Sequence, residues 1–458
     1  MAPLPRLSRL TAVWCAVGAL PWLVVNALWI QVPLLASRLP RGYASVPALA
    51  LALQGGNAPM LVLYLISSRV DEKRAAAAVA SAATGNASAA AVRREAWRSL
   101  GVAVVAAVAV VVLTLGAFWR GWAVQLCVSF VLGAVGSSGN VFVWALAGAC
   151  GARVARAASV GAALAALAPF ALGLVQQAGT ADGAPRFSPE AFFGCFLLPI
   201  LAAGAFLLTL AGPPNSGAPP PDSAAACMTL EEGALPAHAH LSDGELASSS
   251  MEMDEMAEMA EHPVHEALSA SAEESMPLRG LASQAEYAPM WEKYALMLST
   301  SALNFFFPGV LPAMCAASGA SFQVVYGAGL VTSTAARALC GTRAMQSPRA
   351  GLFAALSVQA VATAALLGAH WRCAGDDSGA CGKSVASASM AAAYAILCAA
   401  FGWASTVLYV RAASLKGGSG GPVATSRRLA AVEQAGGIIG ACTALLVAAL
   451  SRRFRQAL

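Results

Sequence analysis

Charge is scarce in this chain, and the shortage decides the class of protein. Asp, Glu, Lys and Arg make up only 11% of the 458 residues, whereas 58% of the residues are hydrophobic. Soluble domains carry roughly 25% charged residues. A chain this poor in charge cannot cover an ordinary water-soluble core. The composition therefore predicts a membrane protein, with the lipid bilayer as its main solvent.

Several chemical motifs are also missing, and each absence argues against a class of function. The sequence has no GxxxxGK[ST] phosphate-binding loop, so ATP-driven work by this chain alone is not expected. It has no HExxH or Ser–His–acid pattern, so an intramembrane hydrolase is disfavoured. The basic residues are scattered among short loops, which argues against nucleic-acid binding. We predict a protein that is not an enzyme and that needs no cofactor.

Long apolar stretches are what the sequence does contain. A membrane-spanning helix needs about 20 apolar residues, and these stretches lack the alternation of barrel strands. We predict an all-α polytopic fold with eleven transmembrane helices in two bundles of six and five. The predicted spans are Leu10–Leu35, Ala44–Ser67, Leu100–Phe118, Trp122–Cys150, Val154–Gln176, Ala191–Leu210, Trp291–Ala317, Phe322–Leu339, Ala350–His370, Val385–Val410 and Leu429–Leu450.

A long polar segment divides these spans into two blocks. Residues 1–211 form the predicted six-helix bundle, and residues 290–458 form the predicted five-helix bundle. Residues 212–289 begin with a Pro/Gly-rich run and hold most of the acidic residues, so we expect a disordered acidic cytoplasmic loop. Its histidines and methionines match no specific metal spacing, and a solvated tether is the favoured interpretation over metal capture.

The distribution of basic residues predicts the orientation of the chain. With a cytoplasmic N-terminus, most of the 28 Lys and Arg residues fall on the cytoplasmic side, as the positive-inside rule requires. An odd number of spans then places the C-terminus outside the cell. Cys373 and Cys381 flank a short polar loop on that outer side. A disulfide between them and a pair of free thiols are both open interpretations.

Polar side chains inside the first span are the main candidates for a binding site. Trp22, Asn26 and Trp29 follow the spacing of one helix face, and Gln31 lies close by. An aromatic ring beside a carboxamide suits a flat polar solute, because the ring stacks and the amide both donates and accepts hydrogen bonds. The alternative is an interfacial tryptophan belt with a helix–helix hydrogen bond. We favour the ligand-facing interpretation because Trp22 and Asn26 lie well inside the span.

The seventh span loosely repeats this arrangement. Asn304 precedes Pro308 and Pro312, much as Asn26 precedes Pro33, and prolines at related positions predict interrupted helices beside a binding site. Small residues such as those of Gly436–Gly440 predict close helix packing. The full set of predicted substrate-binding residues is Trp22, Asn26, Trp29, Gln31, Asn57, Ser138, Asn140 and Asn304.

The first span and its following loop resemble those of the eukaryotic riboflavin transporters. The segment from Trp22 to Pro33, with Leu39-Pro-Arg-Gly-Tyr43 after it, is similar to the family pattern W-x-x-x-N-G-[IL]-W-x-E-L-P followed by L-P-E-G-W. In the seventh span, the segment from Asn304 to Pro312 is similar to N-A-L-T-N-G-x-L-P. The resemblance implies a major-facilitator-like carrier that takes up riboflavin, or a similar vitamin, at the plasma membrane.

The chain departs from that family pattern at several polar positions. Gln31 and Arg41 stand where the family has glutamates, and Pro308 stands where it has a second asparagine. No Asp or Glu lies in the middle of a predicted span; Glu433 is near the start of the last one. Because proton-driven carriers usually keep a buried titratable group, this favours facilitated transport or a coupling that the sequence does not locate.

Two other functions remain open at this stage. One is a carrier of another planar organic solute such as a nucleoside. The other is a membrane scaffold or receptor that transports nothing and uses the acidic loop to bind a partner. Competition between flavins and nucleosides separates the first from a riboflavin carrier, and deletion of the loop separates the second.

Overall fold

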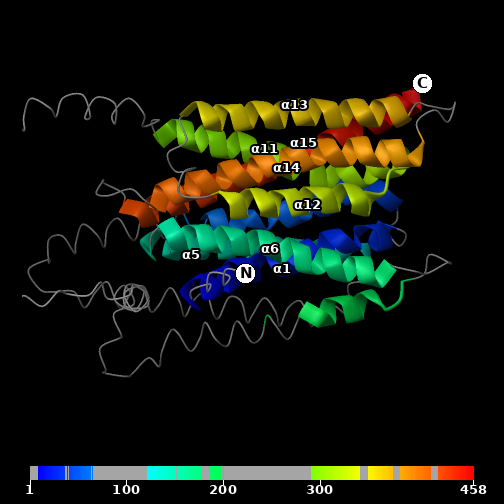
Figure 1. The fold of residues 1–458 in the computed structure, drawn as a ribbon. Coiled ribbons are helices and arrows are strands. Elements are labelled where there is room, and N and C mark those ends of the chain that lie inside the picture. Colours follow the sequence, from blue (N-terminus) through cyan, green and yellow to red (C-terminus); the bar gives the residue numbers. More distant parts are fainter. Residues whose placement is uncertain are drawn as a thin grey trace, which may run out of the picture.

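The computed structural model describes nine long stretches and four single residues of the chain. These are residues 9–36, 39, 41–62, 64, 66, 121–150, 152–177, 185–196, 200, 290–340, 349–374, 382–413 and 421–457. The elements named here are helical and run along one another in a long bundle (Figure 1). They are α1 (Arg9–Ala36), η1 (Gly42–Ser45), α2 (Val46–Gly55), α5 (Trp122–Cys150), α6 (Ala152–Gln177), α11 (Met290–Ala317), α12 (Phe322–Leu339), α13 (Arg349–Ala374), α14 (Lys383–Ala413) and α15 (Gly421–Ala457).

Six of the described helices are long and apolar enough to cross a membrane. They contain the segments Trp14–Ala36, Ala152–Gln176, Met290–Ala317, Arg349–Cys373, Lys383–Ala413 and Ala424–Ser451. By length and composition the chain is therefore a multi-pass membrane protein with an all-α fold. The predicted span 100–118 and most of the span 191–210 lie outside the described residues, as does the loop 212–289. The number eleven and the division into two bundles remain predictions.

The bounds of most described helices agree closely with the apolar stretches, and α2 and α15 are the exceptions. α2 ends at Gly55, because a turn at Gly56 interrupts the predicted span Ala44–Ser67. α5 and α12 begin and end at the predicted residues, because polar or turn-forming residues flank both stretches. α15 instead begins at Gly421, before the predicted start at Leu429. Glu433 therefore lies well inside a helix rather than near its first turn.

The prolines do not break the helices that contain them. α1 is continuous through Pro21 and Pro33, and α11 is continuous through Pro308 and Pro312. The prediction of interrupted helices is therefore wrong for these two elements. A proline removes one backbone hydrogen bond and leaves the others, and neighbouring helices can hold the element in place.

Glycines allow several helix pairs to approach backbone to backbone. A Cβ atom added to Gly18 of α1 would lie 2.1 Å from the carbonyl oxygen of Ala158 in α6, and one added to Gly161 would lie 1.9 Å from that of Cys15. A Cβ atom on Gly440 of α15 would similarly lie 2.4 Å from the Ala302 oxygen of α11. These contacts bear out the prediction that small residues pack the helices, as is common in lipid.

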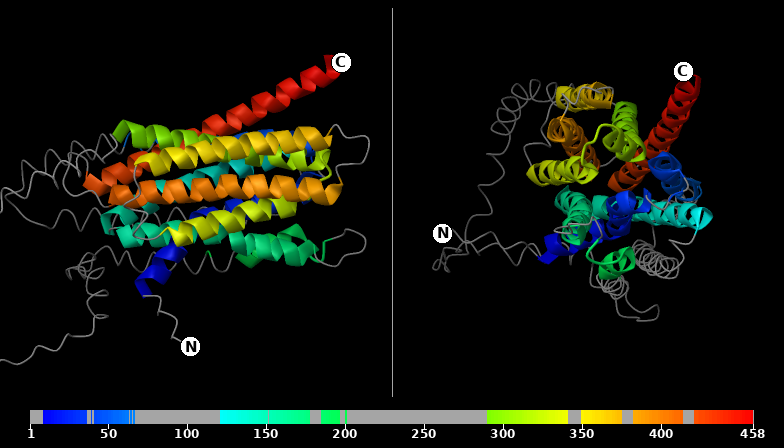
Figure 2. Two further views of the ribbon diagram at one scale, coloured as in Figure 1. Left: turned by 45° about the horizontal axis from the view of Figure 1, so that its top comes forward. Right: turned by 90° about the vertical axis from the view of Figure 1, so that its right-hand side faces the viewer.

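The outer surface of the bundle carries large apolar side chains. Val361 of α13 is 69% exposed and Trp371 is 78% exposed, and Leu446 of α15 is also exposed. A soluble monomer rarely leaves apolar patches of this kind open to water. The last turns of α15 leave the bundle altogether (Figure 2).

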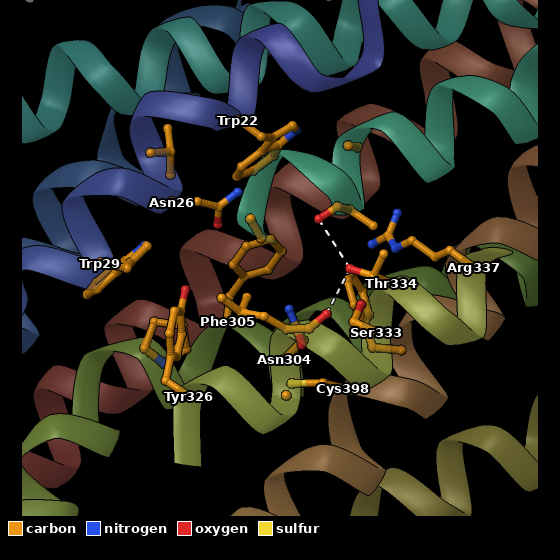
Figure 3. Close-up of a pocket in the computed structure, with 18 of the residues that line it drawn as sticks. Trp22, Asn26, Trp29, Asn304, Phe305, Tyr326, Ser333, Thr334, Arg337 and Cys398 are labelled. Carbon is orange, nitrogen blue, oxygen red and sulfur yellow. Dashed lines mark hydrogen bonds between the residues drawn. The ribbon is translucent and has the colours of Figure 1, made fainter. Parts of the chain in front are cut away.

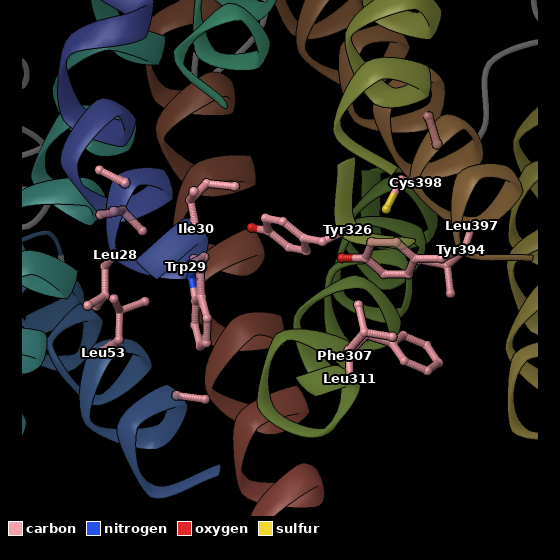
Figure 4. Close-up of a cluster of buried hydrophobic side chains, with 14 of the residues drawn as sticks. Leu28, Trp29, Ile30, Leu53, Phe307, Leu311, Tyr326, Tyr394, Leu397 and Cys398 are labelled. Atoms are coloured by element: carbon pink, nitrogen blue, oxygen red, sulfur yellow. The ribbon is translucent and has the colours of Figure 1, made fainter. Parts of the chain in front are cut away.

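The interior combines aliphatic layers with aromatic side chains that reach toward the middle of the bundle. Phe307 of α11 is fully buried and makes an edge-on contact with Tyr394 of α14, with ring centroids 6.1 Å apart. Tyr394 in turn stacks on Tyr326 of α12. The hydroxyl end of Tyr326 points toward α1, where Trp29 lies (Figure 4).

Candidate functional site

A cavity of about 130 Å³ lies in the middle of the bundle, between helices from both ends of the chain. We call α1, α2, α5 and α6 the amino-terminal set, and α11 to α15 the carboxy-terminal set. All four helices of the first set line the cavity, together with α11, α12, α14 and α15 of the second. The cavity is therefore shared between the sets (Figure 3).

Aromatic rings form much of the cavity wall. Trp22 of α1 stacks against Phe305 of α11, with ring centroids 6.4 Å apart and an interplanar angle of 25°. Trp29, Trp144 and Tyr326 also line the cavity. Because stacked pairs span about 4.5 to 7 Å, the Trp22–Phe305 pair is at the wide end of that range. The pair joins the two sets across the cavity.

Carboxamides lie among these rings. Asn26 of α1, Gln54 of α2 and Asn304 of α11 line the cavity from three helices. Asn57 is one layer behind: its Nδ2 donates to Oε1 of Gln54 at 2.6 Å. The cavity thus offers amide donors and acceptors near flat apolar surfaces, a combination that binds polar aromatic molecules.

Gln31 does not belong to the cavity wall. Its side chain is fully buried, and its Nε2 donates to Oε1 of Gln176 in α6 at 2.7 Å. Gln176 Nε2 in turn donates to the carbonyl oxygen of Phe187 at 3.0 Å. The two amides therefore fasten α1 to α6, so Gln31 is placed for helix packing rather than for contact with a solute in this cavity.

The structure places the four remaining predicted residues only in part. Ser138 and Asn140 are on α5, but their side chains lie outside the described residues. Cys373 at the end of α13 is disulfide-bonded. Cys381 lies outside the described residues, so its pairing with Cys373 stays a prediction.

Two ionisable side chains of opposite charge share the cavity wall. Glu433 of α15 is 6% exposed, and one of its oxygens accepts a hydrogen bond from Tyr409 Oη of α14 at 2.5 Å. Arg337 of α12 also lines the cavity and interacts electrostatically with Glu433. The guanidinium lies 5.6 Å from the ring centroid of Phe401. Tyr409 is itself fixed by stacking on Trp144, with centroids 3.9 Å apart.

Hydrogen bonds join the two sets near the end of the bundle where α6 begins and α12 ends. Arg337 Nη1 donates to Ser159 Oγ at 3.2 Å, and Ser159 Oγ shares a 2.7 Å hydrogen bond with Thr406 Oγ1. Arg156 Nη2 donates to the carbonyl oxygen of Ala338 at 2.7 Å. These contacts join α6 of the amino-terminal set to α12 and α14 of the carboxy-terminal set at this end of the bundle.

Sequence reasoning found part of this site and missed the rest. Trp22, Asn26 and Trp29, which were grouped by their helix spacing, line one cavity together with Asn304, which was proposed from the repeated arrangement in the seventh span. Glu433 was passed over because the start of its helix was placed too late. Its signal was an acidic residue beside the Gly-rich stretch of an otherwise apolar segment. The remaining cavity residues that were not predicted include Gln54, Trp144, Phe305, Tyr326, Arg337 and Phe401.

Comparisons with known proteins add little to this geometry. No protein-family model matches the chain, and no curated protein sequence matches it. Among solved structures, the chain is similar to the major facilitator superfamily proton:xylose symporter XylE bound to 6-bromo-6-deoxy-D-glucose, with a TM-score of 0.49 and 13% sequence identity. The match covers 98% of this chain and 89% of that one. This likeness is too weak to assign a family or a substrate.

Proposed function

We propose that this chain is a membrane transporter that carries riboflavin, or a closely related flavin, by alternating access. The observation that carries the proposal is the cavity between the two sets, with aromatic rings and carboxamides on facing helices. A site shared by two sets of helices can be exposed to one side of the membrane and then to the other when the sets rock against each other. This is the behaviour required of a carrier.

The chemistry of the wall matches a planar, polar heterocycle. A flat ring system can enter between Trp22 and Phe305 once the two sets move apart and this stacked pair separates. Asn26 and Asn304 then face the polar edge of the ring or the hydroxyls of its side chain. The resemblance of the first span to the riboflavin transporters supports the same solute class. A nucleoside shares these features and is the competing solute.

The size of the cavity requires that it open before it can hold such a solute. Pockets for drug-sized ligands measure about 300 to 1,000 Å³, whereas this cavity measures about 130 Å³. The contacts of Ser159 with Arg337 and Thr406 hold one end closed. We take this to be a contracted state, from which the two sets separate to load the solute. The proposal places the chain in the plasma membrane, with a cytoplasmic N-terminus and an extracellular C-terminus.

Uptake of labelled riboflavin in a riboflavin-auxotrophic host tests the proposal. Trp22→Ala is expected to reduce uptake about tenfold or more, since a stacking contact contributes about 1–3 kcal/mol and 1.4 kcal/mol is tenfold. Asn26→Ala is expected to reduce uptake about two- to tenfold, since a neutral hydrogen bond contributes about 0.5–1.5 kcal/mol. Trp371→Ala is the matched control, because that tryptophan is 78% exposed on the outer surface. Surface expression is measured for every variant.

The same host separates the candidate solutes. Unlabelled flavins should compete with uptake, and nucleosides should not. The reverse order of competition would replace riboflavin by a nucleoside. Uptake at the level of empty cells, with the protein present at the surface, would reject a riboflavin carrier.

A further inference from the structure

Glu433 is a carboxylate held in the interior of the bundle at the wall of the cavity. Among the described residues that line the cavity, it is the one acidic side chain. It is the thirteenth residue of α15, which begins at Gly421, and it is 6% exposed. Isolated charges in such surroundings are costly. A buried carboxylate in a membrane helix therefore calls for a specific role.

Few side chains near Glu433 can stabilise its negative charge. Its helix, α15, packs against α11, α5, α2 and α14. The cavity-lining side chains from the first three are the neutral Asn304, Phe305, Pro308, Trp144, Leu53 and Gln54. From α14, Tyr409 donates a hydrogen bond to the carboxylate, and from α12 Arg337 acts on it electrostatically. The other titratable side chains on the wall are Tyr326, Tyr394 and Cys398, which are ordinarily neutral in neutral and acidic solution.

Arg337 connects this carboxylate to the closed end of the bundle. Its guanidinium donates from Nη1 to Ser159 in the amino-terminal set, while its charge interacts with Glu433 in the carboxy-terminal set. The Nε of Arg337 is buried and has no hydrogen-bond partner among the described residues. A change of charge on Glu433 therefore acts directly on a side chain that holds the two sets together.

Resting on the proposed transport function, we propose that Glu433 is a proton-binding site that couples movement of the solute to movement of a proton. The carboxylate takes a proton from water that reaches the cavity on one side of the membrane, and it becomes neutral. Arg337 then loses its anionic neighbour, which alters the Arg337–Ser159 contact between the sets. After the sets rearrange, the proton leaves to water on the other side. The solute itself is not chemically changed.

Proteoliposomes that contain the full chain test this inference, with labelled riboflavin as the probe. Counterflow of riboflavin without a pH gradient measures exchange alone. An imposed gradient, acidic outside, should then drive accumulation by up to about tenfold per pH unit if one proton moves with each solute. A trapped pH-sensitive dye should report acidification of the lumen when riboflavin is added outside.

Matched variants separate a proton site from a structural role. Glu433→Gln should abolish accumulation driven by the gradient, whereas Glu433→Asp, which keeps a carboxylate, should retain it. Glu190→Gln is the control, because Glu190 is exposed and does not line the cavity. If the wild-type chain shows counterflow but neither gradient-driven accumulation nor proton movement, the coupling is wrong. The assignment to Glu433 is wrong if Glu433→Gln still accumulates riboflavin in response to the gradient. If the wild-type chain shows no counterflow at all, the proposed function itself fails.

Discussion

Removal of the Ser159 hydroxyl should loosen the closed end of the bundle. Ser159 Oγ accepts a hydrogen bond from the charged Arg337 at 3.2 Å and shares another with Thr406 at 2.7 Å. A hydrogen bond to a charged group contributes about 1.5–3 kcal/mol, and a neutral one contributes about 1 kcal/mol. Ser159→Ala therefore removes about 3 kcal/mol from the state with this end closed. If both contacts break when the end opens, the population of the open state rises roughly a hundredfold.

Cys340 provides the readout, because it lies directly after α12 at this end and is buried. Burial raises the pKa of the Cys340 thiol, and the nearby charges of Arg156 and Arg337 oppose that shift. The thiolate is the form that reacts, so a water-soluble maleimide should label Cys340 slowly in the wild-type protein. Opening of the end should both expose the thiol and lower its pKa. Labelling of the Cys340 peptide, followed by mass spectrometry at fixed pH, measures the rate.

The expected result is an increase in the labelling rate of ten- to a hundredfold for Ser159→Ala. Ser389→Ala is the matched control, because the Ser389 hydroxyl donates to the carbonyl of Val385 in its own helix, near the opposite end of α14. That variant should label Cys340 at the wild-type rate. A rate for Ser159→Ala within twofold of the wild-type rate would refute the idea that these contacts hold the end closed.

Three further predictions concern stability. Gly18→Ala should lower the melting temperature in detergent, because its Cβ would lie 2.1 Å from a backbone oxygen and overpacking costs about 1–3 kcal/mol. In the control Gly368→Ala the added Cβ meets no atom within 4 Å, so that variant should be neutral or stabilising. Equal melting temperatures for the two variants would contradict this reasoning. Arg349→Ala should destabilise the protein by on the order of 2 kcal/mol, because it leaves the buried carboxylate of Glu292 without its ion pair. The double variant with Glu292→Gln should recover part of the lost stability. No recovery would contradict the claim that the ion pair stabilises the protein. Cys373→Ser should make thermal unfolding insensitive to reducing agents if this disulfide is the one that stabilises the fold; a reductant effect that survives the substitution would show that another bond is responsible.

The individual helices could be predicted well because each depends on local composition. The bounds of α5 and α12 follow from apolar runs between flanking polar or turn-forming residues. The grouping of Trp22, Asn26 and Trp29 likewise follows from helix periodicity alone. Small residues such as Gly440 also indicated close packing correctly, although not the helix against which they pack.

The contacts between distant helices could not be predicted, because no local pattern encodes the identity of a neighbouring helix. Gln31 looked like a binding residue, yet its side chain donates a hydrogen bond to Gln176, which lies 145 residues away in the chain. Glu433 looked like a terminal residue until α15 proved to begin at Gly421. The partnership of Ser159 with Thr406, 247 residues apart, had no signal in the sequence. The site thus depends on tertiary packing more than the helices do.

Binding of riboflavin to the purified protein tests the central claim most directly, through quenching of flavin fluorescence by a stacked tryptophan. Wild-type protein and Trp371→Ala should quench the fluorescence in a saturable manner with similar affinity. Trp22→Ala should lose most of the quenching and bind at least about tenfold more weakly. Quenching and affinity at the wild-type level in Trp22→Ala would contradict the claim that a planar solute binds in the cavity between the two sets.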